Sequence, residues 1–139
     1  MTEEDVPIWI ATEVHYWIDI FSLATWNVTI ALDRVVLDNP NCLGWCQRNA
    51  SYNHAVLHFR DDIEDTPKWR KVILHECLHI LMARVDAYVQ DAMQPQLAES
   101  SQDFAGMVYT QHTESFVQML TAAFWRYYVE RVGIEHGRK

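Results

Sequence analysis

Basic residues are scarce in this sequence of 139 residues. It has 11 Lys and Arg against 19 Asp and Glu, which gives a formal net charge of -8 with neutral histidines. Binding to nucleic-acid phosphates requires a clustered basic surface, and so few cations do not provide one. We therefore expect no DNA or RNA partner, and we attribute the acidic excess to solubility.

A long hydrophobic run is also missing. The apolar stretch that begins at Ile8 is interrupted by Glu13, His15 and Asp19, and residues 1–5 are acidic where a signal peptide would be basic. We expect neither a secretion signal nor a transmembrane segment, and hence no membrane partner. The expected location is the cytoplasm, with either a microbial or a viral genome as the source.

Cysteine is too rare for a disulfide framework. There are three, Cys42, Cys46 and Cys77, so one would be left without a partner. The spacing of Cys42 and Cys46 is too unspecific to indicate a metal or redox site. Partly buried free thiols are the expectation.

Apolar side chains, by contrast, are abundant. Half of the residues are hydrophobic, and six are tryptophan. A chain of this length can bury one sizeable core but is too short for a second. We therefore expect residues 1–139 to form a single domain.

The motif that indicates a chemistry is His75-Glu76-Cys77-Leu78-His79, an HExxH pentapeptide within a strongly helical stretch. Histidines four positions apart lie one turn apart on one helix face, so both imidazoles can reach a single ion. Zinc suits such ligands, and a catalytic zinc needs one further protein ligand and a water. Glu76 is the predicted general base that takes a proton from this water. The alternative is a chance match on an amphipathic helix.

Hydrophobic periodicity predicts the elements before this motif. A first helix is expected from Val6 to Leu23, with Pro7 in its first turn. Turn residues at 39–41 separate the first two of the extended segments that follow. These segments are Trp26–Leu32 with a continuation through Val35–Leu37, then Leu43–Gln47, then His54–Phe59.

The second half of the chain is predicted to be mainly helical. Thr66 and Pro67 are a typical N-cap and first residue for the HExxH helix, which is apolar on nearly all sides and should be buried. A loop is expected from Gln90 to Ser101, followed by a long helix that starts at a capping box over residues 100–103 and ends at Gly133. The predicted fold class is α+β, with an N-terminal helix, a small three- to four-stranded sheet, the HExxH helix and a long C-terminal helix.

This order of elements, together with the HExxH motif, resembles the minimal catalytic core of the zincin metallopeptidases. The likeness is to the gluzincins, the thermolysin-like group, and the chain is similar in size to the very small minigluzincins. The resemblance implies that Glu114 on the long helix is the third zinc ligand and that Gln118, one turn later, orients the first zinc histidine. Gluzincins have an acid at this last position, and an amide would raise the basicity of the histidine less.

The stretch Asn49-Ala50-Ser51-Tyr52-Asn53 resembles the Asn-Ala-x-aromatic edge strand with which such enzymes hold substrate. The resemblance implies that Asn49, Ala50 and Tyr52 bind an extended peptide, which would add to the sheet as a further strand. The alternative is a polar hairpin turn. The candidates for the His or Tyr that stabilises the oxyanion in this family are Tyr109, His112 and Tyr52.

Helix geometry also bears on the third ligand. Asp86 lies on the histidine face, but about 10 Å beyond His79 along the axis, which is out of reach of the same ion. His112 and Glu114 point about 200° apart on one helix, so only one of them can face the metal. The Glu114 face is mixed and polar, which suits a ligand, and it contains Met107, Gln111, Gln118, Thr121 and Trp125. The His112 face is typical of packing, and it contains Phe116, Met119 and Ala123.

These features predict a zinc-dependent endopeptidase with one Zn²⁺ per chain and a peptide or protein as substrate. His75, His79 and Glu114 would hold the metal, and Glu76 would pass the proton of the water to the departing amine. One alternative is a regulatory or interaction protein on the same fold that binds zinc but is a weak or inactive catalyst. The other is a structural helical domain with a chance motif. Metal content separates this last case from the others, and peptide cleavage separates the first two.

Overall fold

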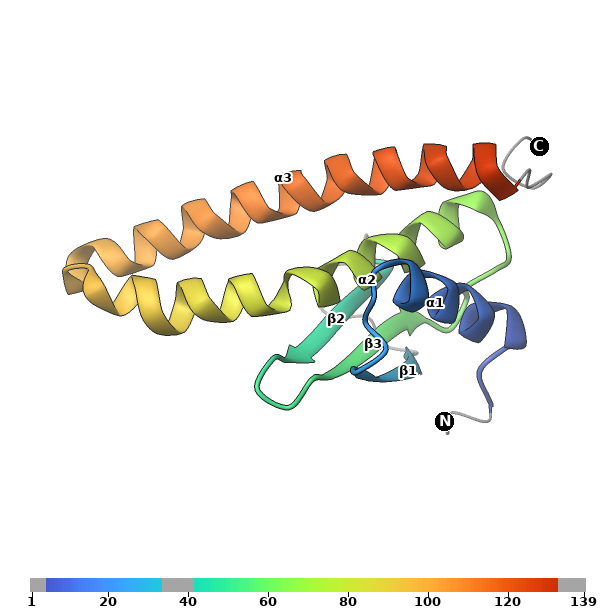
Figure 1. Ribbon diagram of the computed structural model, residues 1–139, viewed down its shortest axis with the longest axis horizontal. Coiled ribbons are helices and arrows are strands. Elements are labelled where there is room, and N and C mark those ends of the chain that lie inside the picture. The colour runs from blue at the N-terminus through green and yellow to red at the C-terminus, as the bar shows by residue number, and fades with distance from the viewer. Residues whose placement is uncertain (1–4, 34–41, 133–139) are drawn as a thin grey trace.

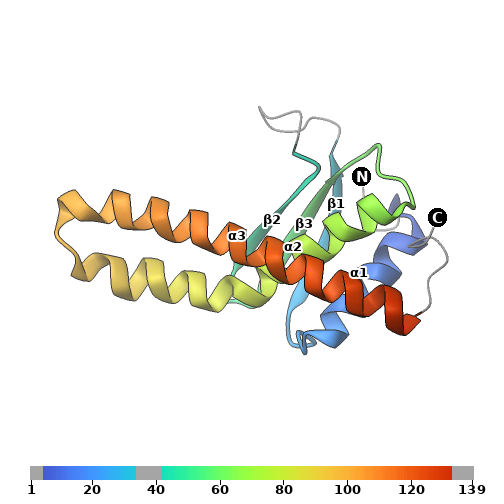
Figure 2. The same ribbon diagram turned by 90° about the horizontal axis from the view of Figure 1, so that it is seen from above.

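The chain folds into three long helices and a small sheet. The computed structural model describes residues 5–33 and 42–132. Figure 1 shows α2 and α3 running side by side as a long hairpin, with α1 and the sheet on the other side of α2. Seen from above in Figure 2, the far end of this hairpin extends beyond the sheet. The predicted α+β class is confirmed by the element order α1 (Ile8–Ile20), β1 (Asn27–Asp33), β2 (Gly44–Asn49), β3 (His54–Arg60), α2 (Pro67–Tyr88), η2 (Val89–Met93), η3 (Gln94–Gln96) and α3 (Glu99–Val132).

The sheet contains three described strands in the order β1-β3-β2. The central strand β3 pairs with β1 in parallel and with β2 in antiparallel orientation. Ala55, Leu57 and Phe59 alternate along β3 as buried residues, as expected when one face of a sheet packs on helices. Because β2 is last in the strand order, it is an edge strand among the described strands, and it also contacts α2.

The predicted strands agree with the observed ones to within two residues at each end. Two expectations cannot be compared, because the continuation at Val35–Leu37 and the turn at 39–41 lie outside the described residues. The first helix is shorter than predicted. It begins at Ile8, directly after Pro7, and ends at Ile20, shortly before Ser22 takes a positive φ of 56°.

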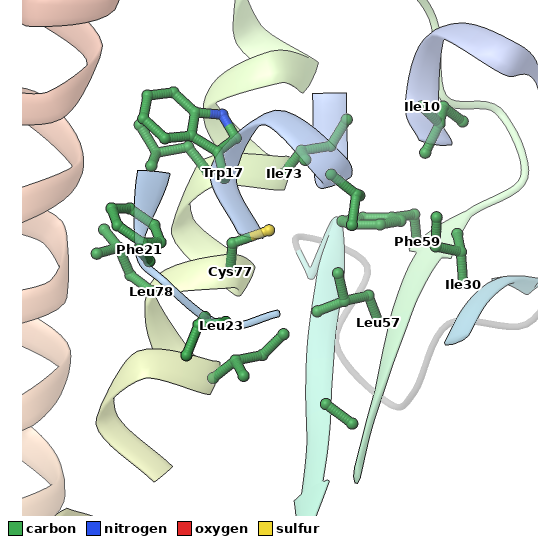
Figure 3. Close-up of a cluster of buried hydrophobic side chains, with 14 of the residues drawn as sticks. Ile10, Trp17, Phe21, Leu23, Ile30, Leu57, Phe59, Ile73, Cys77 and Leu78 are labelled. Atoms are coloured by element: carbon green, nitrogen blue, oxygen red, sulfur yellow. The ribbon is translucent and has the colours of Figure 1, made fainter. Parts of the chain in front are cut away.

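The hydrophobic core lies between α1, α2, the second half of α3 and the inner face of the sheet. Ile10 and Trp17 of α1 are fully buried, as are Leu57 of β3 and Ile73 of α2. Figure 3 shows side chains from these elements meeting in one cluster. Each buried side chain of this size contributes roughly 1.5–3 kcal/mol to folding. This cluster therefore fixes the position of the HExxH helix relative to the sheet.

Helix α2 begins as predicted. The hydroxyl oxygen of Thr66 accepts a hydrogen bond from the backbone N–H of Trp69 at 3.3 Å, and Pro67 occupies the first helical position. Ile73, Cys77 and Leu78 are completely buried, which confirms that α2 is a central helix. None of the helices in the described ranges is both long and apolar enough to cross a membrane.

The predicted loop over residues 90–101 is wrong. The chain instead remains helical through a π-helical turn, η2, and a 3₁₀ turn, η3, and α3 begins at Glu99. Pro95 lies in the first turn of η3, where the missing N–H removes no hydrogen bond of the helix. Residues 100–103 therefore lie inside the first turn of α3 and do not form the predicted cap.

Candidate metal centre

The two histidines of the HExxH motif lie on one face of α2. The ring centroids of His75 and His79 are 5.0 Å apart, as the four-residue spacing requires. Their side chains are 19% and 14% exposed, so both rings are held mainly by protein yet reach solvent. This face of α2 looks toward α3.

Glu114 of α3 meets both histidines. Its Oε1 lies 2.8 Å from Nε2 of His75, and its Oε2 lies 3.2 Å from Nε2 of His79. One ligand atom from each of the three side chains lies within 4.8 Å of the others. The antiparallel packing of α2 and α3 thus brings together three residues that the sequence predicted as a set.

The chemistry of this donor set fits a zinc ion. A tetrahedral zinc with ligands at about 2.0–2.1 Å separates its ligand atoms by about 3.3 Å, which the contact of Glu114 with His79 at 3.2 Å approaches and the contact with His75 at 2.8 Å undercuts. Two imidazole nitrogens that face one carboxylate can contact it through N–H hydrogen bonds or share a metal ion with it. Burial lowers the pKa of His79 and so favours the neutral imidazole, which is the form that binds metals.

The other two candidate ligands lie elsewhere. His112 is exposed on the opposite face of α3, together with Phe116 and Met119, which are 42% and 62% exposed. The expectation that this face packs against protein is therefore wrong for the described chain. Asp86 is buried, but it belongs to a separate hydrogen-bond network and lies outside the three-residue cluster.

Thr121 of α3 orients His75. Thr121 was predicted to lie on the same helix face as Glu114, but no role was predicted for it. Oγ1 of Thr121 lies 3.4 Å from Nδ1 of His75 and donates its own proton to the carbonyl oxygen of Val117 at 2.7 Å. The hydroxyl can then accept a hydrogen bond from Nδ1–H, which leaves Nε2 of His75 to face Glu114. Gln118, the residue implied by the family resemblance, is exposed, and its role stays a prediction.

His79 lacks a comparable support. Its Nδ1 is buried, and no residue of the described chain forms a hydrogen bond with it. Its orientation therefore depends on packing and on the contact of Nε2 with Glu114.

Glu76 lies one position beyond His75 on α2 and is only 7% exposed. Burial and the nearby charge of Glu114 raise the pKa of its carboxyl group to about 8, against the opposing charge of Arg48. This pKa lies close to neutral pH, the range in which a carboxyl group can both accept and release a proton. Its position and environment match the role of a general base.

Asp86 is the centre of a polar network beside the cluster. Tyr109 of α3 donates to Oδ1 of Asp86 at 2.6 Å, and Arg48 of β2 forms an ion pair with Oδ2. The hydroxyl of Tyr109, predicted as a candidate oxyanion stabiliser, is thus directed at a carboxylate. A cavity of about 70 Å³ adjoins this network, and it is lined by Arg48, His79, Asp86, Gln90, Tyr109, Thr110, Thr113 and Glu114.

The predicted substrate strand is for the most part a hairpin turn. Asn49 is the last residue of β2 and pairs with His54, whereas residues 50–53 form the turn that connects β2 with β3. The side chain of Asn49 accepts a hydrogen bond from the backbone N–H of Ser51 at 3.1 Å, and Tyr52 is 81% exposed at the tip. Ala50 and Tyr52 therefore belong to a hairpin turn, as in the alternative interpretation. The edge strand is β2, which ends just before them.

Comparisons with known proteins identify no relative. No family model, no curated protein and no solved structure matches the chain. We therefore infer its function from the side chains of the site alone.

Proposed function

We propose that this protein is a zinc-dependent endopeptidase of the gluzincin type. The observation that carries the proposal is the meeting of His75, His79 and Glu114, whose ligand atoms lie within 4.8 Å of one another. Chance placement of an HExxH motif on a helix does not explain why a carboxylate from a second helix contacts both histidines. Glu76, buried beside this cluster, supplies the base that peptide hydrolysis needs.

In this proposal, zinc held by His75, His79 and Glu114 would polarise the attacking water and the scissile carbonyl. Glu76 accepts a proton from the water as the water oxygen forms a bond with the carbonyl carbon. The carbon–nitrogen bond then breaks, and Glu76 returns the proton to the departing amine nitrogen. The products are an amine and a carboxylic acid, which releases the second proton of the water to solvent, and Glu76 ends the cycle ready to accept another proton.

The edge of β2 that faces away from β3 pairs with no other described strand, and it offers a place for an extended peptide. The backbone N–H of Arg60 donates to the carbonyl of Leu43, so Leu43 points its main-chain groups at β3. Successive residues of an antiparallel strand point these groups alternately toward and away from the partner strand. The main-chain groups of Cys46 and Arg48 therefore point away from β3. A substrate strand could pair with these groups. Because β2 contacts α2, a peptide bound there would run close to the HExxH helix.

The test is metal analysis of the purified protein together with cleavage of an unstructured protein such as casein. We expect one zinc per chain, and we expect cleavage that stops on addition of 1,10-phenanthroline and returns with added zinc. Zinc without cleavage would favour the regulatory or interaction protein instead. Absence of bound zinc after incubation with the metal would reject both interpretations.

A further inference from the structure

Arg48, which no sequence pattern indicated, is the cation beside the candidate site. It is the next-to-last residue of the edge strand β2, and its side chain lines the same cavity as His79 and Glu114. Its positive charge is within electrostatic reach of both Glu76 and His79. Among the residues that line this cavity, Arg48 is the one with a permanent positive charge.

Two elements hold the guanidinium of Arg48 in place. Its Nη2 pairs with Oδ2 of Asp86 on α2, and Asp86 is only 5% exposed. The other oxygen of Asp86 accepts the hydrogen bond from Tyr109 on α3 at 2.6 Å. Asp86 is therefore fixed from both sides, and it fixes Arg48 in turn.

Arg48 has more hydrogen-bonding capacity than Asp86 uses. A guanidinium has five N–H donors in a rigid plane; Asp86 takes Nη2, and the thiol of Cys46 is a further hydrogen-bonding neighbour of the side chain. The side chain is 27% exposed and lines the cavity, so part of it can contact a bound molecule. An arginine anchored in this way is suited to bind an oxygen atom that gains negative charge during a reaction.

We propose that Arg48 is a catalytic residue that donates hydrogen bonds to the substrate carbonyl oxygen as that oxygen becomes negative, with Asp86 and Tyr109 as its positioning residues. The inference rests on the proposed peptidase function and assigns the oxyanion stabiliser of that same site. When the water oxygen attacks, the electron pair of the carbonyl double bond moves onto the oxygen, and it returns when the carbon–nitrogen bond breaks. Arg48 takes up no proton in either step.

The most informative variant is Arg48→Lys. A lysine keeps the positive charge that Asp86 needs, so a purely structural ion pair would be preserved and the protein should fold. A single ammonium group, however, cannot replace the rigid fork that contacts Asp86 and a substrate oxygen together. The matched control is Arg84→Lys, because the exposed Arg84 also links α2 to the β2–β3 hairpin, through Asn53, but on the solvent side.

Three measurements on the zinc-loaded proteins decide the matter. Both variants should retain one zinc per chain. Arg48→Lys should lower kcat on a quenched fluorescent peptide by about 10²-fold, the typical cost of losing one oxyanion donor, while KM changes little. Its affinity for a phosphinic pseudopeptide, which mimics the tetrahedral and anionic reacting centre, should fall by a similar factor in calorimetry. Arg84→Lys should stay within about twofold of the parent, as expected for a surface change.

The proposal would be overturned if Arg48→Lys bound the phosphinic pseudopeptide as tightly as the parent, or if it lost zinc. The binding measurement also separates this inference from the proposed function. A parent protein that binds zinc but cleaves nothing would reject the peptidase, yet weaker phosphinate binding by Arg48→Lys would still support an anion-binding Arg48. A parent that holds no zinc would reject both.

Discussion

Glu13 of α1 and Arg70 of α2 form an ion pair in the interior of the protein, and the Glu13 side chain is only 3% exposed. Two further donors reach the same carboxylate. Nε1 of Trp17 donates to Oε1 at 3.3 Å, and the hydroxyl of Tyr128 on α3 donates to Oε2 at 3.0 Å. One buried carboxylate thus connects all three helices, including the helix that carries Glu114.

This network predicts a large loss of stability for Glu13→Ala. The change removes the buried partner of Arg70, which keeps its second ion pair with the more exposed Asp65, so we expect a loss of about 3 kcal/mol, the low end for a broken buried pair. Tyr128→Phe removes the hydrogen bond to Glu13 and a longer one from Arg70, and it should cost about 1 kcal/mol. Urea denaturation measures both, with the exposed Asp19→Ala on the same helix as the control. A Glu13→Ala effect no larger than that of Asp19→Ala would show that the network does not hold the helices together.

Replacement of Glu76 by Gln should separate metal binding from catalysis. The amide keeps the shape of the side chain but cannot accept the proton of the water, so cleavage should be abolished while zinc content and fold persist. Casein hydrolysis and zinc analysis on the same preparation test this, with the exposed Glu130→Gln as a matched substitution on α3. Cleavage at the parental rate by Glu76→Gln would remove Glu76 from its proposed role.

Removal of the metal should lower thermal stability. Zinc at 100 times its dissociation constant stabilises a protein that binds it only when folded by about 2.7 kcal/mol. For a domain of this size we expect Tm to fall by roughly 10 °C on treatment with a chelator. Calorimetry before and after dialysis against EDTA, and again after zinc is restored, measures the change. An unchanged Tm in zinc-replete and zinc-free protein would mean that the cluster does not hold zinc under these conditions.

Tyr52 at the tip of the β2–β3 hairpin is the remaining test of substrate binding by the Asn49–Tyr52 stretch. If its ring packs against bound peptide, Tyr52→Ala should raise KM by roughly two- to tenfold, the usual worth of one aromatic contact, without loss of zinc. Tyr88→Ala is the control, since Tyr88 is also an exposed tyrosine, 63% accessible at the end of α2. Equal KM values for both variants would exclude the hairpin tip from substrate binding.

Local patterns in the sequence predicted a large part of this fold and of the candidate site. The i, i+4 spacing of His75 and His79 follows from helix geometry, which also places His112 and Glu114 on different faces of α3. The choice of Glu114 as the third member of the cluster was implied by the resemblance to the gluzincins. The strands were predictable from their alternation.

The partners of isolated polar residues could not be predicted in this way. Arg48 and Asp86 are 38 residues apart, and Glu13 and Arg70 are 57 apart, so no local periodicity connects them. Glu13 interrupts an apolar run and indicated only that the run does not cross a membrane. For Glu13, the signal that could have identified it is a single charge on a helix face that is otherwise apolar, since such a charge needs a buried partner. Arg48 lies on a short strand, where no such pattern is present.

The proposed metal centre is tested most sharply by the zinc affinities of Glu114→Ala and His112→Ala, determined by competition with a chromophoric chelator. Because the Glu114 carboxylate contacts both histidines while His112 is exposed on the opposite face of α3, we predict different results for the two variants. Glu114→Ala should weaken zinc binding by more than about 100-fold, beyond the usual effect of an outer-shell residue and comparable with His79→Ala, and His112→Ala should bind zinc as the parent does. Parental affinity in Glu114→Ala together with loss of zinc in His112→Ala would contradict the proposed metal centre.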